Sequence, residues 1–376
     1  MSFHDDHGLA CTGADADSAA HYRRALHQFR CYIEDPVASV DAALALRPDF
    51  VMAHALKAWL HLLGTEPAGI PVARACLLAA SRLPAWSRAM AGHHAVLGMH
   101  AFGLEECGDY VRAEAQGRAG VELEPRDGWA QHAVAHVMEM QGRERDGIAW
   151  MRADPAAWST DSFFRVHNWW HLALYHLELG EIDEVLALYD GPIRGERSTV
   201  ILDLIDASAM LWRLHLRGID VGSRWQRLAE DWAPFAAAGN YAFNDVHATM
   251  AFVGAGRLDL VDTVLEAQRA AMQGDGDNAA FTREVGQPLT RAIRAFGEGH
   301  HAETVRLIRD VREIAHRFGG SHAQRSVLDL TLIEAALRDG QQALAVALCN
   351  ERVDTRPHSP LTRLLRQRAA PLRAAA

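Results

Sequence analysis

The stretch Asp161–Gly191, DSFFRVHNWWHLALYHLELGEIDEVLALYDG, decides the fold of this chain. Apolar residues recur at helical spacing up to Gly180, and a second apolar stripe begins at Ile182. A glycine between two such stripes suits a turn, because it adopts backbone angles that other residues avoid. The stretch therefore predicts two antiparallel helices joined at Gly180. The first helix also carries a dense polar cluster for an apolar segment: His167, Asn168, Trp169, Trp170, His171 and His176.

Similar turn glycines recur along the chain, at Gly64, Gly108, Gly142, Gly180, Gly218, Gly256, Gly299 and Gly340. Their successive spacings are 44, 34, 38, 38, 38, 43 and 41 residues, which is typical of an array of helical hairpins. Trp169, Leu172 and Ala173 match the packing positions of the first helix of a tetratricopeptide repeat. The pattern predicts an all-α solenoid of about nine hairpins, curled around a concave central pocket.

Length and composition set the expected domain organisation. The chain has 376 residues, of which 49% are hydrophobic and 7% aromatic, and it has few β-branched runs that would indicate strands. No loop has the length or composition of an interdomain linker. We therefore expect a flexible N-terminal tail over 1–16 and a single solenoid domain over 17–351. An Arg-rich tail over 352–376, with a short capping helix, is expected to solvate the end of the array.

Charge, cysteines and hydropathy argue against several classes of protein. A net charge of −10 without a basic block disfavours nucleic acid as a partner. The five cysteines are scattered and lack a CxxC pair, which disfavours a disulfide framework or zinc ribbon and favours a reducing cytoplasm. The first residues resemble neither a signal peptide nor an anchor, and no apolar run suits a membrane span. We expect a soluble, cytoplasmic protein.

Three stretches carry a resemblance to a known family: VHNWWHLALYHLELG (Val166–Gly180), NDVHATMAFVGAGR (Asn244–Arg257) and GGSHAQRSVLDLTLIEAAL (Gly319–Leu337). With them, the whole chain resembles the tetratricopeptide repeat protein 38 family. The resemblance implies a divergent, curled tetratricopeptide array, and it implies no particular reaction. It also singles out His322 at the start of the last array helix. Arg325 would lie in the same first turn, where a helix N-terminus favours anionic groups.

Histidines are abundant, 21 in the chain, and their helical phase places several on one side of the array. At roughly 100° per residue, the side opposite the packing positions lines the concave surface. His132 and His136, His167 and His171, and His247 all fall on that side. Candidate catalytic residues are His136, His167, His171, His247 and Glu139. Candidate ligand-binding residues are His132, Asn168, Trp170, Glu178, Asn244, His322 and Arg325. Trp169 is expected in the core, whereas Trp170 is expected to form a wall of the pocket.

Two histidine pairs have the i,i+4 spacing with which one helix face presents two imidazoles to a metal ion. His132 and His136 read HAVAH, and His167 and His171 read HNWWH, so neither pair belongs to an HExxH motif. The spacing is compatible with a divalent transition metal, but also with acid–base chemistry without a metal. Glu139 and Glu178 could serve as ligands, as orienting groups or as a general base. A polar groove without chemistry is a further alternative for the same residues.

These observations leave two hypotheses for the function. In the first, the pocket binds a small molecule and hydrolyses or eliminates it through its histidines, with or without a metal. In the second, the protein is an adaptor that binds a peptide or protein segment in its groove. Peptide-binding grooves favour lysine, arginine and asparagine, and lysine is absent from the concave positions. This absence favours the small-molecule pocket.

Overall fold

The computed structural model describes residues 3–4, 10–31, 34–63, 69–83 and 93–370. The chain divides into two compact units, residues 1–96 and 97–376. Aspartate and serine side chains start several of the helices by accepting the first free backbone N–H groups. Asp35, Asp127 and Ser359 do so at the starts of α2 (Pro36–Leu46), α7 (Gly128–Met140) and α21 (Pro360–Ala369). Ser321 forms a reciprocal capping box with Gln324.

The first unit is a small helical bundle with one pair of short strands. Its elements are β1 (Phe3–His4), β2 (Ala10–Cys11), α1 (Ala16–Cys31), α2 (Pro36–Leu46), α3 (Val51–Leu63) and α4 (Gly69–Ser81). The two strands pair antiparallel, with Phe3 opposite Cys11. Cys11 and Phe50 belong to the same apolar core. Strand pairing and core contacts thus involve Phe3 and Cys11, and the flexible tail over 1–16 stays a prediction.

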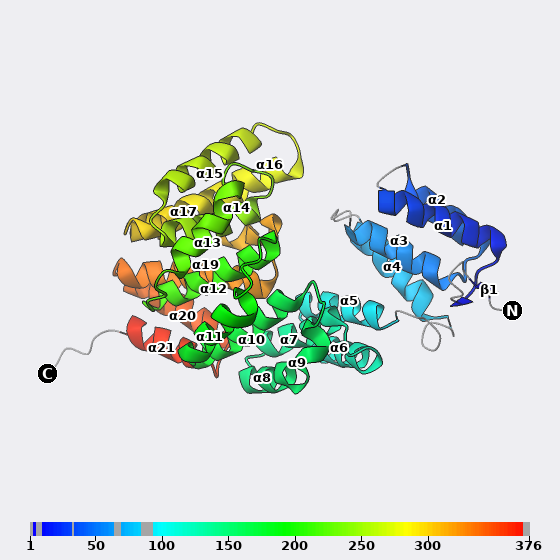
Figure 1. The fold of residues 1–376 in the computed structure, drawn as a ribbon, viewed down its shortest axis with the longest axis horizontal. Helices are drawn as coiled ribbons and strands as arrows, with labels where there is room; N and C mark the ends of the chain where they lie inside the picture. The colour runs from blue at the N-terminus through cyan, green and yellow to red at the C-terminus, as the bar shows by residue number, and fades with distance from the viewer. Residues whose placement is uncertain (1–2, 5–9, 32–33, 64–68, 84–92, 371–376) are drawn as a thin grey trace. The chain divides into compact units, whose positions relative to one another are not determined.

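The second unit holds most of the helices (Figure 1). Short 3₁₀ or π-helical turns at Tyr189–Ile193, Ala233–Phe235, Thr282–Gly286 and Arg312–Phe318 connect some of them. The helices are α5 (His93–Glu106), which crosses the boundary between the units, α6 (Tyr110–Leu123), α7 (Gly128–Met140), α8 (Glu144–Ala153), α9 (Pro155–Ser159), α10 (Arg165–Leu179), α11 (Ile182–Leu188), α12 (Ile201–Leu216), α13 (Arg224–Trp232), α14 (Ala242–Gly254), α15 (Leu258–Ala271), α16 (Asp277–Phe281), α17 (Gln287–Gly297), α18 (His301–Val311), α19 (His322–Arg338), α20 (Gln342–Thr355) and α21 (Pro360–Ala369).

The turn glycines occupy the positions that the sequence predicts. Gly64 lies outside the described residues. The other seven adopt a positive φ, between 64° at Gly142 and 80° at Gly180 and Gly299. Each of these seven ends the first helix of a hairpin. Together with the packed pairs α1–α2 and α3–α4, they give nine hairpins in the described residues. The prediction of an all-α solenoid of about nine helical hairpins is confirmed.

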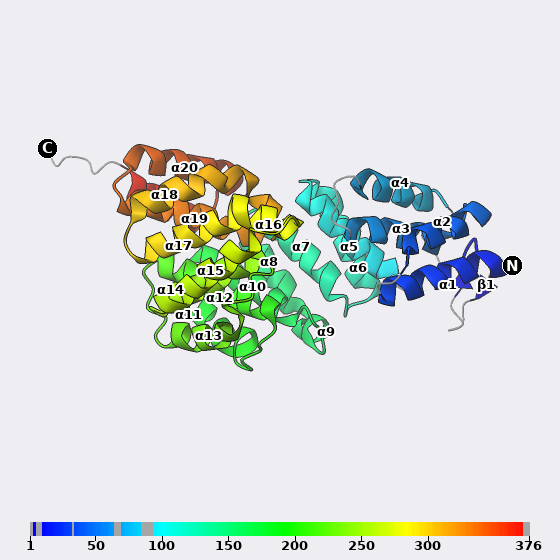
Figure 2. The ribbon, with the colours of Figure 1, turned by 90° about the horizontal axis from the view of Figure 1, so that it is seen from above.

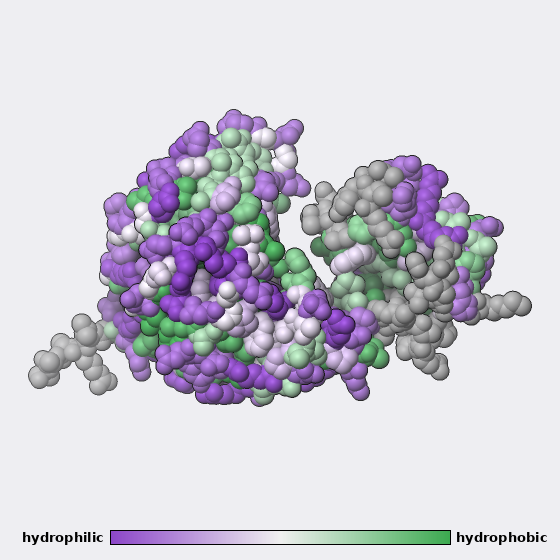
Figure 3. All heavy atoms as spheres, in the orientation of Figure 1, coloured by the Kyte–Doolittle hydropathy of each residue, from purple (hydrophilic) through white to green (hydrophobic). Residues whose placement is uncertain are grey.

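The second unit closes on itself rather than forming an open crescent. Helix α19 packs against both α12 and α7, and α21 packs against α10 and α19 (Figures 1 and 2). Elements from the end of the chain thus contact helices that precede them by some 200 residues. Closure buries both sides of α7, α10 and α12, which explains why nearly every residue of α10 is buried. Hydrophilic side chains cover much of the face in Figure 3.

The C-terminal segment contributes buried contacts to this closure. The predicted short capping helix corresponds to α21. Arg356, however, is buried and donates to the backbone oxygen and the carboxylate of Glu139, while Arg352 bonds to Glu178. These two arginines do not solvate the end of the array, because they neutralise buried acids on α7 and α10. The predicted single domain over 17–351 stays a prediction.

Candidate functional site

Four histidines from two neighbouring helices form a buried cluster in the second unit. His132 and His136 lie on α7, and His167 and His171 lie on α10, which packs beside it. One ring nitrogen of each lies within 4.8 Å of those of the others. The Nε2 atoms of His132 and His167 are 3.1 Å apart. All four side chains are buried, and His136 and His171 are fully excluded from solvent. We call this group the His cluster.

Carboxylates stand behind three of the four imidazoles. His167 Nδ1 lies 2.8 Å from Asp206 Oδ2 of α12, and His171 Nδ1 lies 3.0 Å from Glu139 Oε2 of α7. His136 Nδ1 lies 3.4 Å from Glu105 Oε2 of α5. An ionised carboxylate only accepts hydrogen bonds, so Nδ1 of His167 and of His171 must carry the proton. Their Nε2 atoms are then left with a lone pair.

One of these two lone pairs, that of His171 Nε2, has no hydrogen-bond donor among the described residues. Among the described residues, His171 Nε2 and both ring nitrogens of His136 are buried without a hydrogen-bond partner. Buried polar atoms are rarely left without a partner. The Nε2 atoms of His132 and His167, by contrast, are hydrogen-bonded to each other, so that without a metal His132 Nε2 donates to the His167 lone pair. Metal-binding histidines commonly use one nitrogen as a ligand while the other donates to a carboxylate, so these residues fit a metal ion.

Burial keeps three of the imidazoles, His132, His136 and His171, neutral. It lowers the pKa of His132 and of His171 well below the ordinary value, and neighbouring histidines add to the shift. Burial also lowers the pKa of His136 to about 4. The same effect raises the pKa of Glu105 to about 7. Metal ions bind neutral imidazole, so ligands of this kind are available at neutral pH without losing a proton.

A cavity of about 240 Å³ adjoins one edge of the His cluster. His132 and His167 form part of its wall, whereas His136 and His171 lie behind them. Aromatic rings make up much of the remaining wall, and the N-terminus of α19 contributes polar groups. The lining residues are Phe102, Glu106, Trp129, His132, Phe164, His167, Leu202, Gly320, Ser321 and Gln324. We call this space the aromatic cavity.

His322 and Arg325 approach the aromatic cavity through Glu106. The Glu106 carboxylate accepts the backbone N–H of His322 at 3.2 Å and lies 3.7 Å from His322 Nε2 and 3.8 Å from Arg325. A carboxylate at a helix N-terminus is electrostatically favourable. The structure therefore brings these two residues, singled out by family resemblance and helix position, to within one side chain of the cavity wall.

Two predicted site residues lie elsewhere. His247 on α14 does not join the His cluster, because its Nδ1 donates to the Phe243 backbone oxygen at 2.8 Å and its ring packs on the Phe243 ring. His132 takes the place that the sequence assigns to His247. Asn244 is half-buried on α14 and does not line the aromatic cavity. Helical phase gave a direction for these side chains but could not place α14 relative to α7 and α10.

Three further predicted ligand-binding residues have structural contacts. Trp170 is fully buried, stacks on His167 at 5.4 Å and carries the Arg213 guanidinium over its ring, so it does not form a wall of the cavity. The half-buried residue of the tryptophan pair is Trp169. Asn168 donates to the Gly128 backbone oxygen at 3.0 Å and ties α10 to the start of α7. Glu178 is bonded to Arg352 and Ser359.

Sequence reasoning missed Glu105, Glu106 and Asp206. Each is an acid on a largely apolar helix: Glu105 and Glu106 precede the turn glycine Gly108 by three and two residues, and Asp206 lies within the run ILDLIDASAM. A buried acid needs a partner, so an acid at an apolar helical position is a signal that could have been used. It would not have identified the partner, since Asp206 lies 39 residues after His167.

Comparison with known proteins adds little to these observations. No family model matches the chain. Among solved structures, the chain is similar to a tetratricopeptide repeat protein from Parabacteroides merdae, with a TM-score of 0.41 and 13% sequence identity. The similarity covers 73% of this chain and 98% of that one. Within the described residues, no helix is both long enough and apolar enough to cross a membrane.

Proposed function

We propose that the His cluster binds one divalent transition-metal ion and that the aromatic cavity beside it binds a small molecule. On this proposal the protein is a metal-dependent hydrolase or lyase. Its ligands are His132, His136, His167 and His171. The observation that carries the proposal is the set of carboxylates behind the imidazoles, which turns Nε2 of His167 and of His171 into one buried volume. In that volume, His171 Nε2 and both ring nitrogens of His136 have no hydrogen-bond partner among the described residues.

Distances and chemistry support a metal such as zinc. Two nitrogens that share a tetrahedral zinc ion at about 2.0–2.1 Å lie roughly 3.4 Å apart, close to the 3.1 Å between His132 and His167. Imidazole suits zinc, copper, iron and nickel, whereas calcium and magnesium prefer oxygen. Hydrogen bonds from Nδ1 to Asp206 and Glu139 hold two rings in a fixed orientation and raise their basicity. Glu139 thus acts as a positioning residue, not as a general base in contact with substrate.

The aromatic cavity suits a small molecule with an apolar or planar body and a polar group. Phe102, Trp129 and Phe164 offer ring faces and edges to such a body. Glu106 is the carboxylate of the cavity wall, and its bonds to the start of α19 fix its position. When bound, a divalent ion supplies Lewis acidity and lowers the pKa of a coordinated water. Glu106 is the group placed to accept a proton beside it.

Metal content tests the proposal directly. Protein purified without an affinity His-tag should contain close to one equivalent of a transition metal, measured by elemental analysis. The double variant His167→Ala/His171→Ala should lose it. The matched control is His300→Ala/His316→Ala, which removes two exposed histidines outside the His cluster and should retain the metal. Substitution with cobalt, followed by visible absorption, reports whether nitrogen ligands surround the ion.

A third variant distinguishes a built site from adventitious binding. Asp206→Asn keeps every proposed ligand but removes the carboxylate behind His167, so metal affinity should fall by about 10-fold to 100-fold. If the purified protein contains no metal and chelators do not change its melting temperature, the metal proposal is contradicted. The remaining hypotheses are then acid–base chemistry without a metal and the peptide adaptor. If the protein contains stoichiometric metal but binds no small molecule near it, the metal centre is a structural site and the proposed enzymatic activity is contradicted.

A further inference from the structure

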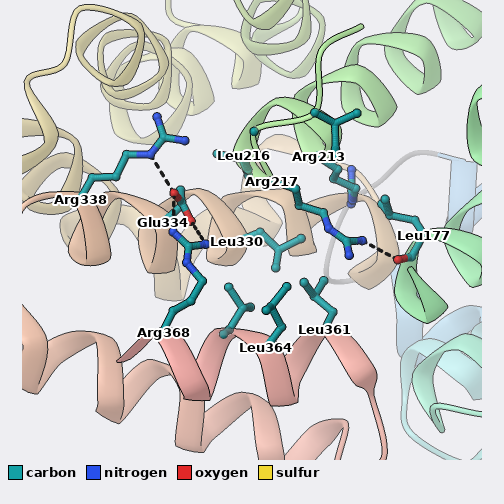
Figure 4. Close-up of a pocket in the computed structure, with 13 residues that line it drawn as sticks. Leu177, Arg213, Leu216, Arg217, Leu330, Glu334, Arg338, Leu361, Leu364 and Arg368 are labelled. Carbon is teal, nitrogen blue, oxygen red and sulfur yellow. Dashed lines mark hydrogen bonds and ion pairs between the residues drawn. The ribbon is translucent and has the colours of Figure 1, made fainter. Parts of the chain in front are cut away.

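A second cavity, of about 420 Å³, lies among α10, α12, α19 and α21 (Figure 4). It is distinct from the aromatic cavity, whose lining residues it does not share. Its volume is in the range that binds small organic ligands. The lining combines arginines with aliphatic side chains: Leu177, Arg213, Leu216, Arg217, Gly218, Ile219, Leu330, Glu334, Arg338, Leu361, Leu364, Leu365 and Arg368. We call it the Arg–Leu pocket.

Positive charge exceeds negative charge in the lining of the Arg–Leu pocket. Four arginines and one carboxylate line it, which gives four minus one, or three, net positive charges. The carboxylate is Glu334, which is buried and accepts hydrogen bonds from both Arg338 and Arg368 (Figure 4). Because Arg338 and Arg368 share the single carboxylate of Glu334, the lining of the pocket keeps a net positive charge.

Within the described residues, Arg217 and Arg213 are the two arginines of the pocket that form no hydrogen bond to a carboxylate. Arg217 donates to the Leu177 backbone oxygen at 2.6 Å, and Arg213 donates to backbone oxygens of α12 and α19 and to Ser326. Glu178, the acid that influences Arg217, is bonded to Arg352 instead. Burial lowers the pKa of Arg217, and that of Arg213 to about 10, but both groups remain charged at neutral pH. Arg217 is half-buried, and its guanidinium N–H groups other than the one bonded to Leu177 have no hydrogen bond to the described residues.

The opposite wall of the Arg–Leu pocket is aliphatic. Leu361 and Leu364 of α21 point up into it towards Leu330 of α19 (Figure 4). Leu364 is 42% exposed, which is high for a large apolar residue beside buried ones. Figure 3 shows hydrophobic atoms gathered near α21 on the face in view. An aliphatic wall opposite a cationic group complements a molecule with an apolar chain and an anionic head.

We propose that the Arg–Leu pocket binds the anion of a fatty acid, with its carboxylate on Arg217 and its alkyl chain along the leucines of α19 and α21. A guanidinium matches a carboxylate in shape and charge, and a partly buried position strengthens the bond. Each methylene of the chain that leaves water adds favourable free energy. This site is independent of the His cluster and does not rest on the proposed metal-dependent activity.

Calorimetric titration with dodecanoate below its micelle concentration tests the site. One equivalent should bind to the full chain. Dodecanol lacks the charge and should bind at least about 10-fold more weakly, since a hydrogen bond to a charged group is worth roughly 10-fold to 100-fold in affinity. Acetate lacks the alkyl chain and should also bind at least about 10-fold more weakly, because it buries no methylenes. Arg217→Ala should weaken dodecanoate binding by about 10-fold or more, with little effect on dodecanol.

Two further variants keep the test decisive if Arg217→Ala disturbs the fold. Leu364→Asp places a negative charge on the exposed edge of the leucine wall and should also weaken dodecanoate binding by about 10-fold. Arg309→Ala removes an exposed arginine of α18 outside the pocket and should change binding by less than about twofold. Equal affinity for dodecanoate and dodecanol, or equal loss in the Leu364 and Arg309 variants, would overturn the proposal.

Discussion

At the residue scale, burial decides the protonation of histidines outside the His cluster as well. Burial lowers the pKa of His247 to about 4, against 6.5 for an exposed imidazole. Below pH 6.5 the unfolded chain takes up a proton that the folded chain refuses, so acidification favours unfolding. For this group alone, the free energy of unfolding should fall by about 2 kcal/mol between pH 7 and pH 5.

The variant His247→Leu isolates this contribution. It cannot take up the proton in either state, so its loss of stability between pH 7 and pH 5 should be smaller than that of the unaltered protein by about 2 kcal/mol. At pH 7 it should lose only about 1 kcal/mol, because the hydrogen bond to Phe243 disappears. Urea unfolding at both pH values, in the presence of a chelator, measures the difference. Parallel pH profiles for the two proteins would show that folding does not lower the pKa of His247.

At the element scale, the turn glycines differ in kind from glycines inside helices. Gly256 has φ +72° and no neighbouring atom within 4 Å of an added Cβ, so Gly256→Ala meets only backbone strain. We expect a loss of about 1 kcal/mol. Gly103 lies inside α5 with equally open surroundings, and Gly103→Ala should stabilise the protein by about 0.5–1 kcal/mol. Thermal denaturation of the two variants tests both signs, and equal shifts would contradict the role of φ.

At the element scale, the sequence predicts the turns and helix faces but not the contacts between distant helices. The turns at Gly108, Gly142 and the later glycines follow from local chemistry, and helical phase places His167 and His171 on one side of α10. Helical phase did not predict Asp206 behind His167, because that contact depends on the angle between α10 and α12. The sequence also did not predict that the second unit closes on itself. Because of this closure, the surface of α10 that was expected to be concave and open is buried.

At the scale of the molecule, closure joins the end of the chain to the His cluster. Arg356 follows α20 and bonds to Glu139, and Glu139 in turn accepts His171 Nδ1. This series of bonds places a C-terminal cation two side chains from the proposed metal ligands. The Glu139 carboxylate is buried, so it depends on Arg356 and His171 for compensation. We therefore expect stability and metal affinity to depend together on Arg356.

The variant Arg356→Met tests this dependence. It removes one partner of a buried ion pair, and the free energy of unfolding should fall by about 3–5 kcal/mol because Glu139 keeps its charge without the guanidinium. Arg366→Met, an exposed position on α21, should stay within about 0.5 kcal/mol of the unaltered protein.

The double variant Glu139→Gln/Arg356→Met should recover part of the lost stability, because no buried charge is left alone. It should not recover the metal affinity, because His171 has lost its carboxylate. Chemical unfolding and metal competition assays separate the two effects. If Arg356→Met behaves like Arg366→Met in both assays, closure of the array positions neither Glu139 nor His171, and the two helices α7 and α10 hold the His cluster by themselves.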